Sequence, residues 1–411
     1  MVVRGLVVAL LISAATITLM GCGGGGGGAG GGGKKLDKVV IASDLPLTGS
    51  SRAQTDSMVK AIEMRLAEAN NKAGSVPITY ESLDDATAQA GKWDEAKCAE
   101  NITKLATKAE VVVVIGPFNS GCAQVQIKIA NQAGLAMVSP ANTAVGLTKA
   151  GGDEGEPDKY YPSGTRNYLR VALADDLQAK AGAIWAKELG KKRAFVLHDK
   201  ETYGKGLADQ FETAARKQGL EVVGVEGIDP LASNYRSLMP KITGEKADIV
   251  YFGGITQNNA GQLAKDLKEA GPSITFMGPD GIYEDAFIEA AGPAANGTLL
   301  TFGGVPPEQL QGAGKEFIKK FTKEHGEPSA YTAYAYDAAG IAIEAVTRCA
   351  KGDGVTRECV VKELFATKDY QGALGSFSIT ETGDTTLTQL SGLTVKDGEF
   401  VFDRTLDAGG S

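Results

Sequence analysis

Two polar turns of the sequence carry hydroxyl side chains that could bind a small anion. Ser120 follows the apolar run 111–115, and Thr143 lies in a second polar turn after the apolar run 135–138. Hydroxyls beside the free backbone N–H groups at a helix start are suited to a carboxylate. Both turns follow the carboxyl ends of expected strands, the edge at which open α/β sheets bind ligands. A second interpretation stays open here, in which Ser120 and Thr143 are ordinary helix caps.

An acidic side chain in a third turn could bind a cation. Asp280 follows the expected strand 274–277 and stands in a Pro-Asp-Gly sequence. A carboxylate at a strand end is a counter-charge for an ammonium group, although Asp in such a turn also caps its own backbone. A zwitterionic ligand needs both kinds of group, and we expect two lobes to close on it to assemble the complete site.

The elements that must position these turns follow a β–α rhythm, which predicts parallel sheets covered by helices. A Gly/Pro-rich stretch, 149–164, reads as a surface insertion between two such series, and a helix-rich return follows. This order predicts two similar lobes with repeated crossings. The expected strands are 38–42, 78–83, 111–115, 135–138, 193–197, 220–225, 247–252, 274–277, 376–379, 387–395 and 400–402. The expected helices are 53–69, 94–107, 120–130, 175–188, 203–219, 257–270, 282–291, 309–325, 331–351 and 355–367.

Composition excludes several classes of protein. The 411 residues carry a net charge of −8, which argues against nucleic acid as the main partner. Only two histidines occur and no Cys-x-x-Cys spacing, so we expect no metal site and no histidine-based hydrolase. No dinucleotide-binding, Walker or nucleophile-elbow motif is present, so we expect no cofactor and no enzyme. The acidic pair Asp84-Asp85 could do acid–base chemistry, but a solvated loop is the favoured interpretation.

The first residues are typical of an export signal. Residues 1–22 comprise a basic start, an apolar run and the ending Leu-Met-Gly-Cys, which resembles a bacterial lipobox with Cys22 as the lipidated residue. A plain signal peptide cut elsewhere is the alternative. The segment 23–35 is a Gly-rich tether. We therefore expect a protein held by lipid at the outer face of the bacterial cytoplasmic membrane.

The four remaining cysteines favour disulfides in an exported chain. Three pairings are possible, and we expect Cys98–Cys122 and Cys349–Cys359. The first pair lies in helices on either side of the strand 111–115. The second flanks a short helix-to-helix turn.

Five ordered motifs resemble one known family. They are IGPFNSG (115–121), VSPANT (138–143), LHDKETYGKGLA (197–208), VYFGG (250–254) and FMGPDG (276–281). Together they are similar to the leucine/isoleucine/valine-binding receptors of ABC importers, and the resemblance spans most of residues 36–403. It implies an α/β fold of the type I periplasmic-binding class, with two Rossmann-like lobes joined by a multi-strand hinge. It also implies a non-catalytic receptor that delivers an amino acid, branched-chain in the first instance, to ABC permease subunits.

The resemblance assigns roles residue by residue. Ser120, Thr143 and the backbone of Ala141 are expected to hold the ligand carboxylate. Tyr203 is expected to reach across from the second lobe, and Asp280 to bind the ammonium group. Asp280 stands where the family usually has glutamate.

The side-chain pocket departs from the family pattern. The first loop has no aromatic residue near Ala53, and Ile255 stands where the family often has tyrosine. We expect Ala53, Ile255 and Phe118 to form the pocket wall. Another amino acid, an amide-like solute or a sensory role for the same fold therefore stays open.

The expected domain limits follow from the same reasoning. Lobe 1 comprises 36–170 and 303–378, lobe 2 comprises 171–302 and 379–403, and 404–411 is a C-terminal tail. We expect a monomer whose partners are the ligand, the permease and the membrane.

Overall fold

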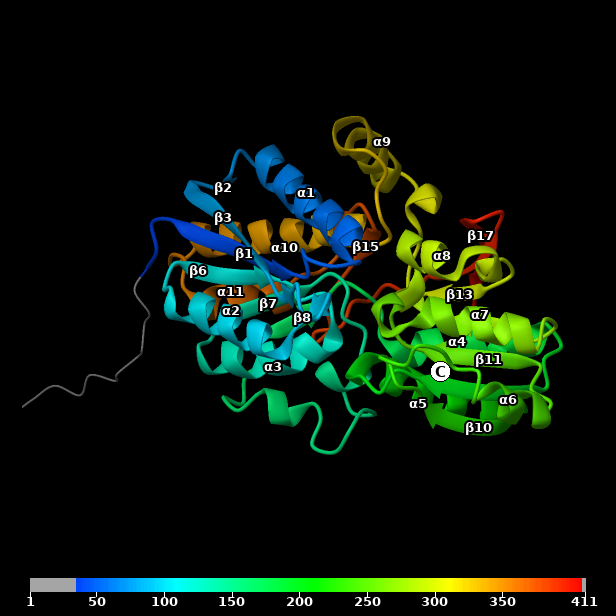
Figure 1. The fold of residues 1–411 in the computed structure, drawn as a ribbon. Helices are drawn as coiled ribbons and strands as arrows, with labels where there is room; N and C mark the ends of the chain where they lie inside the picture. The colour runs from blue at the N-terminus through cyan, green and yellow to red at the C-terminus, as the bar shows by residue number, and fades with distance from the viewer. Residues whose placement is uncertain (1–34, 409–411) are drawn as a thin grey trace, which may run out of the picture. The chain divides into compact units, whose positions relative to one another are not determined.

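The computed structural model describes residues 35–408. The expected signal segment, Cys22 and the tether up to residue 34 lie outside the described residues. Two large sheets, each covered by helices on both faces, form the fold (Figure 1). We call the first sheet with its helices lobe 1 and the second sheet with its helices lobe 2. Among residues 35–408, no helix has the length and apolarity that a membrane crossing requires.

The sheet of lobe 1 has six strands in the order β2-β3-β1-β6-β7-β8. All neighbours pair in parallel except β2 with β3. Its central strand β6 has five consecutive buried residues, as expected for a strand covered on both faces. The bounds are β1 Val39–Leu45, β2 Lys72–Ala73, β3 Val76–Asp84, β6 Val111–Ile115, β7 Ala136–Ser139 and β8 Tyr168–Arg170.

Helices cover both faces of this sheet (Figure 1). On one face, α1 packs against α10 and α10 against α11, and on the other α2 packs against α3. Asp94 caps α2 by accepting from the Lys97 N–H, whereas Asn119 precedes α3 without a side-chain cap bond. The bounds are α1 Arg52–Glu68, α2 Glu95–Thr107, α3 Ser120–Gln132, α9 Ala313–His325, α10 Thr332–Lys351 and α11 Arg357–Phe365.

The sheet of lobe 2 has seven strands in the order β10-β9-β11-β12-β13-β16-β17. The first five are parallel, and β16 and β17 join antiparallel. Helices α4 and α5 pack together on one face, and α6, α7 and α8 pack in sequence on the other. The bounds are β9 Arg193–His198, β10 Glu221–Gly227, β11 Ile249–Gly253, β12 Thr275–Gly278, β13 Leu299–Phe302, β16 Leu390–Lys396, β17 Glu399–Leu406, α4 Asp175–Glu188, α5 Thr202–Gln218, α6 Met239–Gly244, α7 Ala260–Ala270 and α8 Asp285–Ala291.

The chain crosses between the lobes three times, after β8, after β13 and after the small hairpin β14 (Tyr370–Gly372) and β15 (Gly375–Phe377). At the first and third crossings Arg170 donates to Asp384 over 2.7 Å and to Thr148 Oγ1 over 2.7 Å. Arg170 is fully buried and the Asp384 side chain is 16% exposed, so a largely buried ion pair ties two crossings together.

Two details differ from the expected boundaries. The segment 404–411, expected as a tail, begins inside β17, where Leu406 pairs with Leu390 and is 6% exposed in the core around Trp185. The insertion 149–164 is anchored rather than purely superficial, since Tyr160 and Tyr161 are buried in the core beneath α3. Tyr161 also donates to the Leu147 carbonyl over 2.6 Å. Strand pairing thus makes the start of the segment 404–411 part of lobe 2, and buried tyrosines anchor the insertion 149–164 to lobe 1.

The structure contains two disulfide bonds, Cys98–Cys122 and Cys349–Cys359, in the expected pairing. The first joins α2 to the first turn of α3, directly beside Ser120. Both of its cysteines are fully buried.

Candidate ligand-binding site

A cavity lies where loops from the strand ends of both lobes meet. Lobe 1 supplies the loops after β6 and β7 together with the starts of α1 and α10, and lobe 2 supplies the loops after β9, β11 and β12. The lining residues are Gln54, Phe118, Asn119, Ser120, Ala141, Thr143, Tyr203, Ile255, Gln257, Asp280, Gly281, Glu284 and Tyr331. The structure therefore brings Ser120, Ala141, Thr143, Tyr203, Asp280, Phe118 and Ile255, all expected at the site, into one cavity.

Ala53 is the exception and corrects one expectation. It is exposed on α1, whereas the next residue, Gln54, lines the cavity and is 5% exposed. Successive helical residues point about 100° apart, so a shift of one position along the helix changes which side chain faces the ligand.

The two hydroxyl-bearing turns of lobe 1 are bonded to each other. Ser139 donates to the Pro117 carbonyl over 2.8 Å, and Asn142 donates to the Phe118 carbonyl over 2.8 Å. Ser120 Oγ accepts from the Ala144 N–H over 3.3 Å. These bonds fix the Ser120 turn against the turn that carries Ala141 and Thr143, so the donors are pre-positioned.

The side chain of Thr143 lines the cavity, and its hydroxyl also lowers the pKa of the nearby Asp175 carboxyl. Thr143 is 1% exposed, and its Oγ1 has no hydrogen-bond partner within the described part of the chain. A buried hydroxyl without a partner loses the water bonds that it would keep at the surface. A ligand oxygen or nitrogen in the cavity would satisfy it.

Asp280 is the acceptor at the centre of the cavity. Its Oδ1 accepts from Gln178 Nε2 over 2.6 Å and from the Tyr203 hydroxyl over 2.8 Å, and its Oδ2 accepts from the Tyr331 hydroxyl over 2.5 Å. A carboxylate has about four lone-pair positions, so three donors leave room for one more. Burial raises the pKa of the Asp280 carboxyl, and the three hydrogen bonds oppose that rise.

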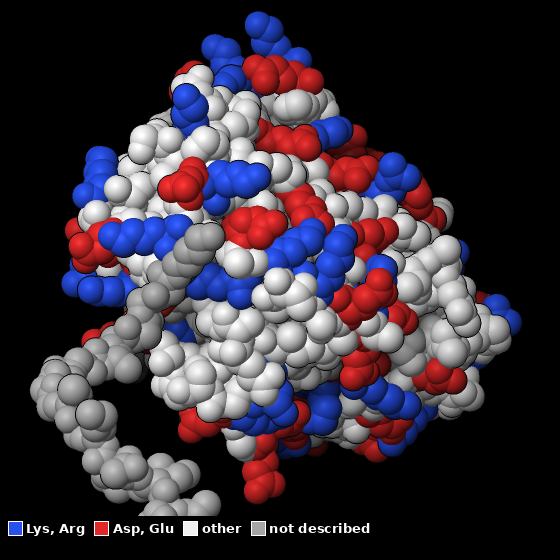
Figure 2. All heavy atoms as spheres, turned by 90° about the vertical axis from the view of Figure 1, so that its left-hand side faces the viewer, with Lys and Arg blue, Asp and Glu red and all other residues white. Residues whose placement is uncertain are grey.

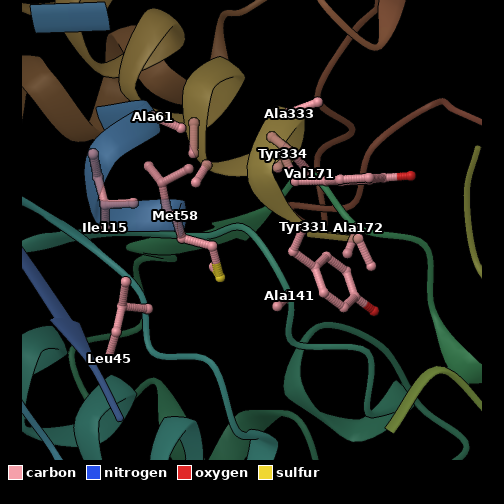
Figure 3. Close-up of a cluster of buried hydrophobic side chains, with 14 of the residues drawn as sticks. Leu45, Met58, Ala61, Ile115, Ala141, Val171, Ala172, Tyr331, Ala333 and Tyr334 are labelled. Atoms are coloured by element: carbon pink, nitrogen blue, oxygen red, sulfur yellow. The ribbon is translucent and has the colours of Figure 1, made fainter. Parts of the chain in front are cut away.

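The aromatic partners differ in part from expectation. Tyr203 was expected to reach across the cleft, but its hydroxyl bonds to Asp280 and the Gly281 N–H of its own lobe, over 2.8 and 3.0 Å. The tyrosine that crosses from the other lobe is Tyr331, at the start of α10, which sequence reasoning missed. Its ring packs edge-on against Phe118 and against Tyr334, with centroids 5.8 and 5.3 Å apart. Figure 3 shows Tyr331 beside Tyr334, with Ala141 near the Tyr331 ring.

A second acid that the sequence did not reveal lies behind the cavity. Asp175 begins α4 and is 1% exposed, and its N–H donates to the Thr143 carbonyl over 2.9 Å. Neither of its carboxylate oxygens has a hydrogen-bond partner among residues 35–408. Burial raises the pKa of the Asp175 carboxyl well above its usual value, and the charge of Asp280 adds to the rise.

Polar contacts join the two lobes outside the cavity lining. Lys92 of lobe 1 forms an ion pair with Glu201 of lobe 2 and donates to Asn258 Oδ1 over 2.7 Å. Trp93 Nε1 donates to Glu201 over 3.2 Å. These contacts join the two lobes directly.

The acidic pair considered for catalysis has a structural role. Asp84 accepts from the N–H groups of Leu47 and Ala86 and from the Thr48 hydroxyl, over 2.8, 2.9 and 2.6 Å. Asp85 is fully buried. These carboxyls therefore shape the first loop of lobe 1 and lie outside the cavity lining.

Charge on the outer surface is mixed. Figure 2 shows lysine and arginine side chains interspersed with aspartate and glutamate on the face that it presents, without a continuous basic area.

Two α/β lobes with a cavity between their strand-end loops are the architecture of a two-lobed binding protein. The sequence pattern of the family described as periplasmic binding protein matches residues 38–399. The chain belongs to this family. Its members bind solutes, which confirms the expectations of a non-enzymatic, extracytoplasmic binding protein.

Individual relatives support the same family. The chain is 29% identical over 352 residues to a Leu/Ile/Val-binding protein homolog 2 of Brucella abortus, covering 85% of this chain and 88% of the relative. The leucine-binding protein LivK of Thermotoga maritima has a TM-score of 0.78 at 24% identity, covering 90% and 99% of the two chains. LivJ of Streptococcus pneumoniae, solved with isoleucine, has a TM-score of 0.74 at 22% identity, covering 90% and 98%. The expected type I periplasmic-binding fold is confirmed.

Proposed function

We propose that this protein captures a small amino acid as its zwitterion and delivers it to the permease of an ABC importer. The observation that carries the proposal is the pairing of donors and an acceptor across one cavity. Ser120, Thr143 and the backbone of their turns face the ligand carboxylate. Asp280 has one free acceptor position for the ammonium group.

Branched-chain amino acids are the first ligands to test. Relatives bear the name Leu/Ile/Val-binding protein, and Phe118, Ile255 and Tyr331 supply apolar surface in the cavity. Tyr203 acts within this proposal as a positioning residue, since its hydroxyl orients Asp280.

Thermal unfolding with each common amino acid at millimolar concentration tests the proposal. A ligand that binds only the folded state stabilises it by RT ln(1 + [L]/Kd), which is about 2.7 kcal/mol at a hundredfold excess over Kd. We expect at least one amino acid to raise the Tm of the natural protein and to leave that of Asp280→Asn unchanged. A panel without any effect would contradict the amino-acid assignment.

The location is also part of the proposal. We propose a lipid on Cys22, the tether 23–35 and a monomer at the outer face of the cytoplasmic membrane. The lobe limits given above (36–170 with 303–378, and 171–302 with 379–403) belong to this proposal. Metabolic labelling of the full chain and of Cys22→Ser with radioactive palmitate tests the anchor. The natural protein is expected to take up label and the variant none, and equal labelling of both would contradict a lipid at this residue.

A further inference from the structure

Part of the cavity lining is left over once the carboxylate and ammonium groups of an amino acid are placed. Ser120, Ala141 and Thr143 occupy the carboxylate side and Asp280 the ammonium side. The remaining lining faces the ligand side chain. It combines apolar surface from Phe118, Ile255 and the Tyr331 ring with polar side chains. The polar side chains are those of Gln54, Asn119, Tyr203, Gln257 and Glu284, and Gly281 completes the remaining lining.

The polar part bridges the two lobes. Gln54 of α1 donates to Glu284 Oε1 over 3.3 Å, and Gln257, which follows β11, donates to Glu284 Oε2 over 2.7 Å. Each carboxylate oxygen thus has one amide donor, and the hydroxyls of Thr256 and Ser51 also act on this carboxyl. We call Gln54, Gln257 and Glu284 the polar end of the cavity.

The polar end offers more acceptors than donors. Gln54 is 5% exposed, and its Oε1 has no hydrogen-bond partner among the described residues. Among residues 35–408, those that line the cavity include no lysine, arginine or histidine. A bound apolar side chain would therefore exclude water from Glu284 and Gln54 without giving them a donor, which carries a desolvation cost.

We propose that the polar end takes a ligand side chain that ends in a hydrogen-bond donor, such as a carboxamide or a hydroxyl. Among amino acids of equal size and shape, the polar member then binds more tightly than the apolar one. Burial raises the pKa of the Glu284 carboxyl to about 7, and hydrogen bonds from Gln257, Thr256 and Ser51 oppose that rise. The inference rests on the proposed function and adds the side-chain chemistry of the ligand.

Isothermal titration calorimetry with two isosteric pairs tests the inference. The pairs are L-asparagine against L-leucine and L-threonine against L-valine. A site built around hydrogen bonds rejects an analogue that leaves its polar groups unpaired. We expect the polar member of at least one pair to bind at least tenfold more tightly. Leucine and valine binding more tightly than both polar partners would overturn the inference while leaving the amino-acid function standing.

Variants at Glu284 separate a side-chain role from an ammonium-binding role. Glu284→Met is expected to reduce the preference for the polar member by at least tenfold and to improve leucine binding. Glu289→Met, on the exposed side of helix α8, which begins directly after Glu284, is the matched control and should leave both affinities unchanged. Equal weakening of both members of a pair by Glu284→Met would show that Glu284 serves the ammonium group and would overturn the inference.

A third substitution covers the case of a misfolded variant. Glu284→Gln keeps the size of the side chain and an acceptor oxygen, and is expected to retain part of the polar preference. If no amino acid binds the natural protein, the proposed function fails together with the inference. If amino acids bind and the isosteric ratios do not change in either variant, only the inference fails.

Discussion

Tyr331 donates a hydrogen bond to Oδ2 of Asp280 over 2.5 Å, and this bond joins lobe 1 to lobe 2 inside the cavity. Tyr331 stands at the start of α10, which packs against the sheet of lobe 1, whereas Asp280 follows β12 of lobe 2. Closure and the orientation of the proposed ammonium acceptor are therefore linked through one hydroxyl.

Removing that hydroxyl should weaken ligand binding. Tyr331→Phe keeps the ring contacts with Phe118 and Tyr334 but loses the bond to Asp280. A hydrogen bond to a charged group contributes about 1.5–3 kcal/mol, so Kd for the bound amino acid should rise roughly tenfold or more. Titration calorimetry measures this. Tyr336→Phe, on the surface of the same helix and bonded to Glu68, should bind as the natural protein does.

Thr143 offers a substitution that separates binding from folding. Thr143→Val keeps the shape and removes Oγ1, which has no partner within the described residues. We expect Kd to rise about tenfold, with a free energy of unfolding equal to or slightly above that of the natural protein. Thr298→Val is the matched control, since Thr298 Oγ1 is equally buried and unpartnered but lies outside the cavity lining. Unchanged affinity in Thr143→Val would remove Thr143 from the site.

The two disulfides should contribute similarly to stability and differently to binding. Their sequence separations are 24 and 10 residues, for which the chain-entropy relation gives about 3 kcal/mol each. Urea unfolding of the two double serine variants should show losses of this order. Only Cys98→Ser/Cys122→Ser should also weaken ligand binding, because that bond braces the turn of Ser120. Loss of affinity in Cys349→Ser/Cys359→Ser instead would contradict this account.

The buried carboxyl of Asp44 should make the stability of the folded protein depend on pH. Burial raises the pKa of its carboxyl from 3.8 to about 7, and the charge of Asp84 adds to the rise. The folded state therefore keeps a proton that the unfolded chain releases across this interval, so this group lowers stability as pH rises from about 4 to 7.

Asp44→Asn removes that effect. Asp44 accepts from Asn101 and Gln126, and Gln126 Oε1 has no partner among the described residues, so the Gln126 amide can turn to accept from the new Asn. Urea unfolding should show the variant gaining stability over the natural protein as pH rises from 4.5 to 8. A difference that stays constant or falls with pH would show that Asp44 is ionised in the folded state.

Much of the fold was predictable because local patterns agree with it. The β-branched run of β6 and the apolar spacing of α4 give the observed bounds, Val111–Ile115 and Asp175–Glu188. The strand β13 was missed because its four residues lie between glycines and only pairing with β12 and β16 identifies it. Short strands form through tertiary contacts, and the periodicity of the sequence does not reveal those contacts.

The site was predictable where turns carry their own signal. Ser120, Thr143 and Asp280 stand in polar turns after strands, and the structure places them on one cavity. Tyr331 was not predicted as a site residue, because the start of α10 carries no polar turn of this kind. Its partner Asp280 also lies 51 residues away in the sequence. Gln54 and Glu284 were not predicted as site residues, because an isolated glutamine or glutamate is ordinarily a solvated surface residue.

The most direct test of the central claim is a crystal structure of the full-length protein purified without denaturation and crystallised with the amino acid that raises its Tm most. The account predicts one zwitterion between the lobes, with its carboxylate at Ser120 and Thr143 and its ammonium group on Asp280. A ligand bound with its carboxylate away from Ser120 and Thr143, or with no contact to Asp280, would contradict it.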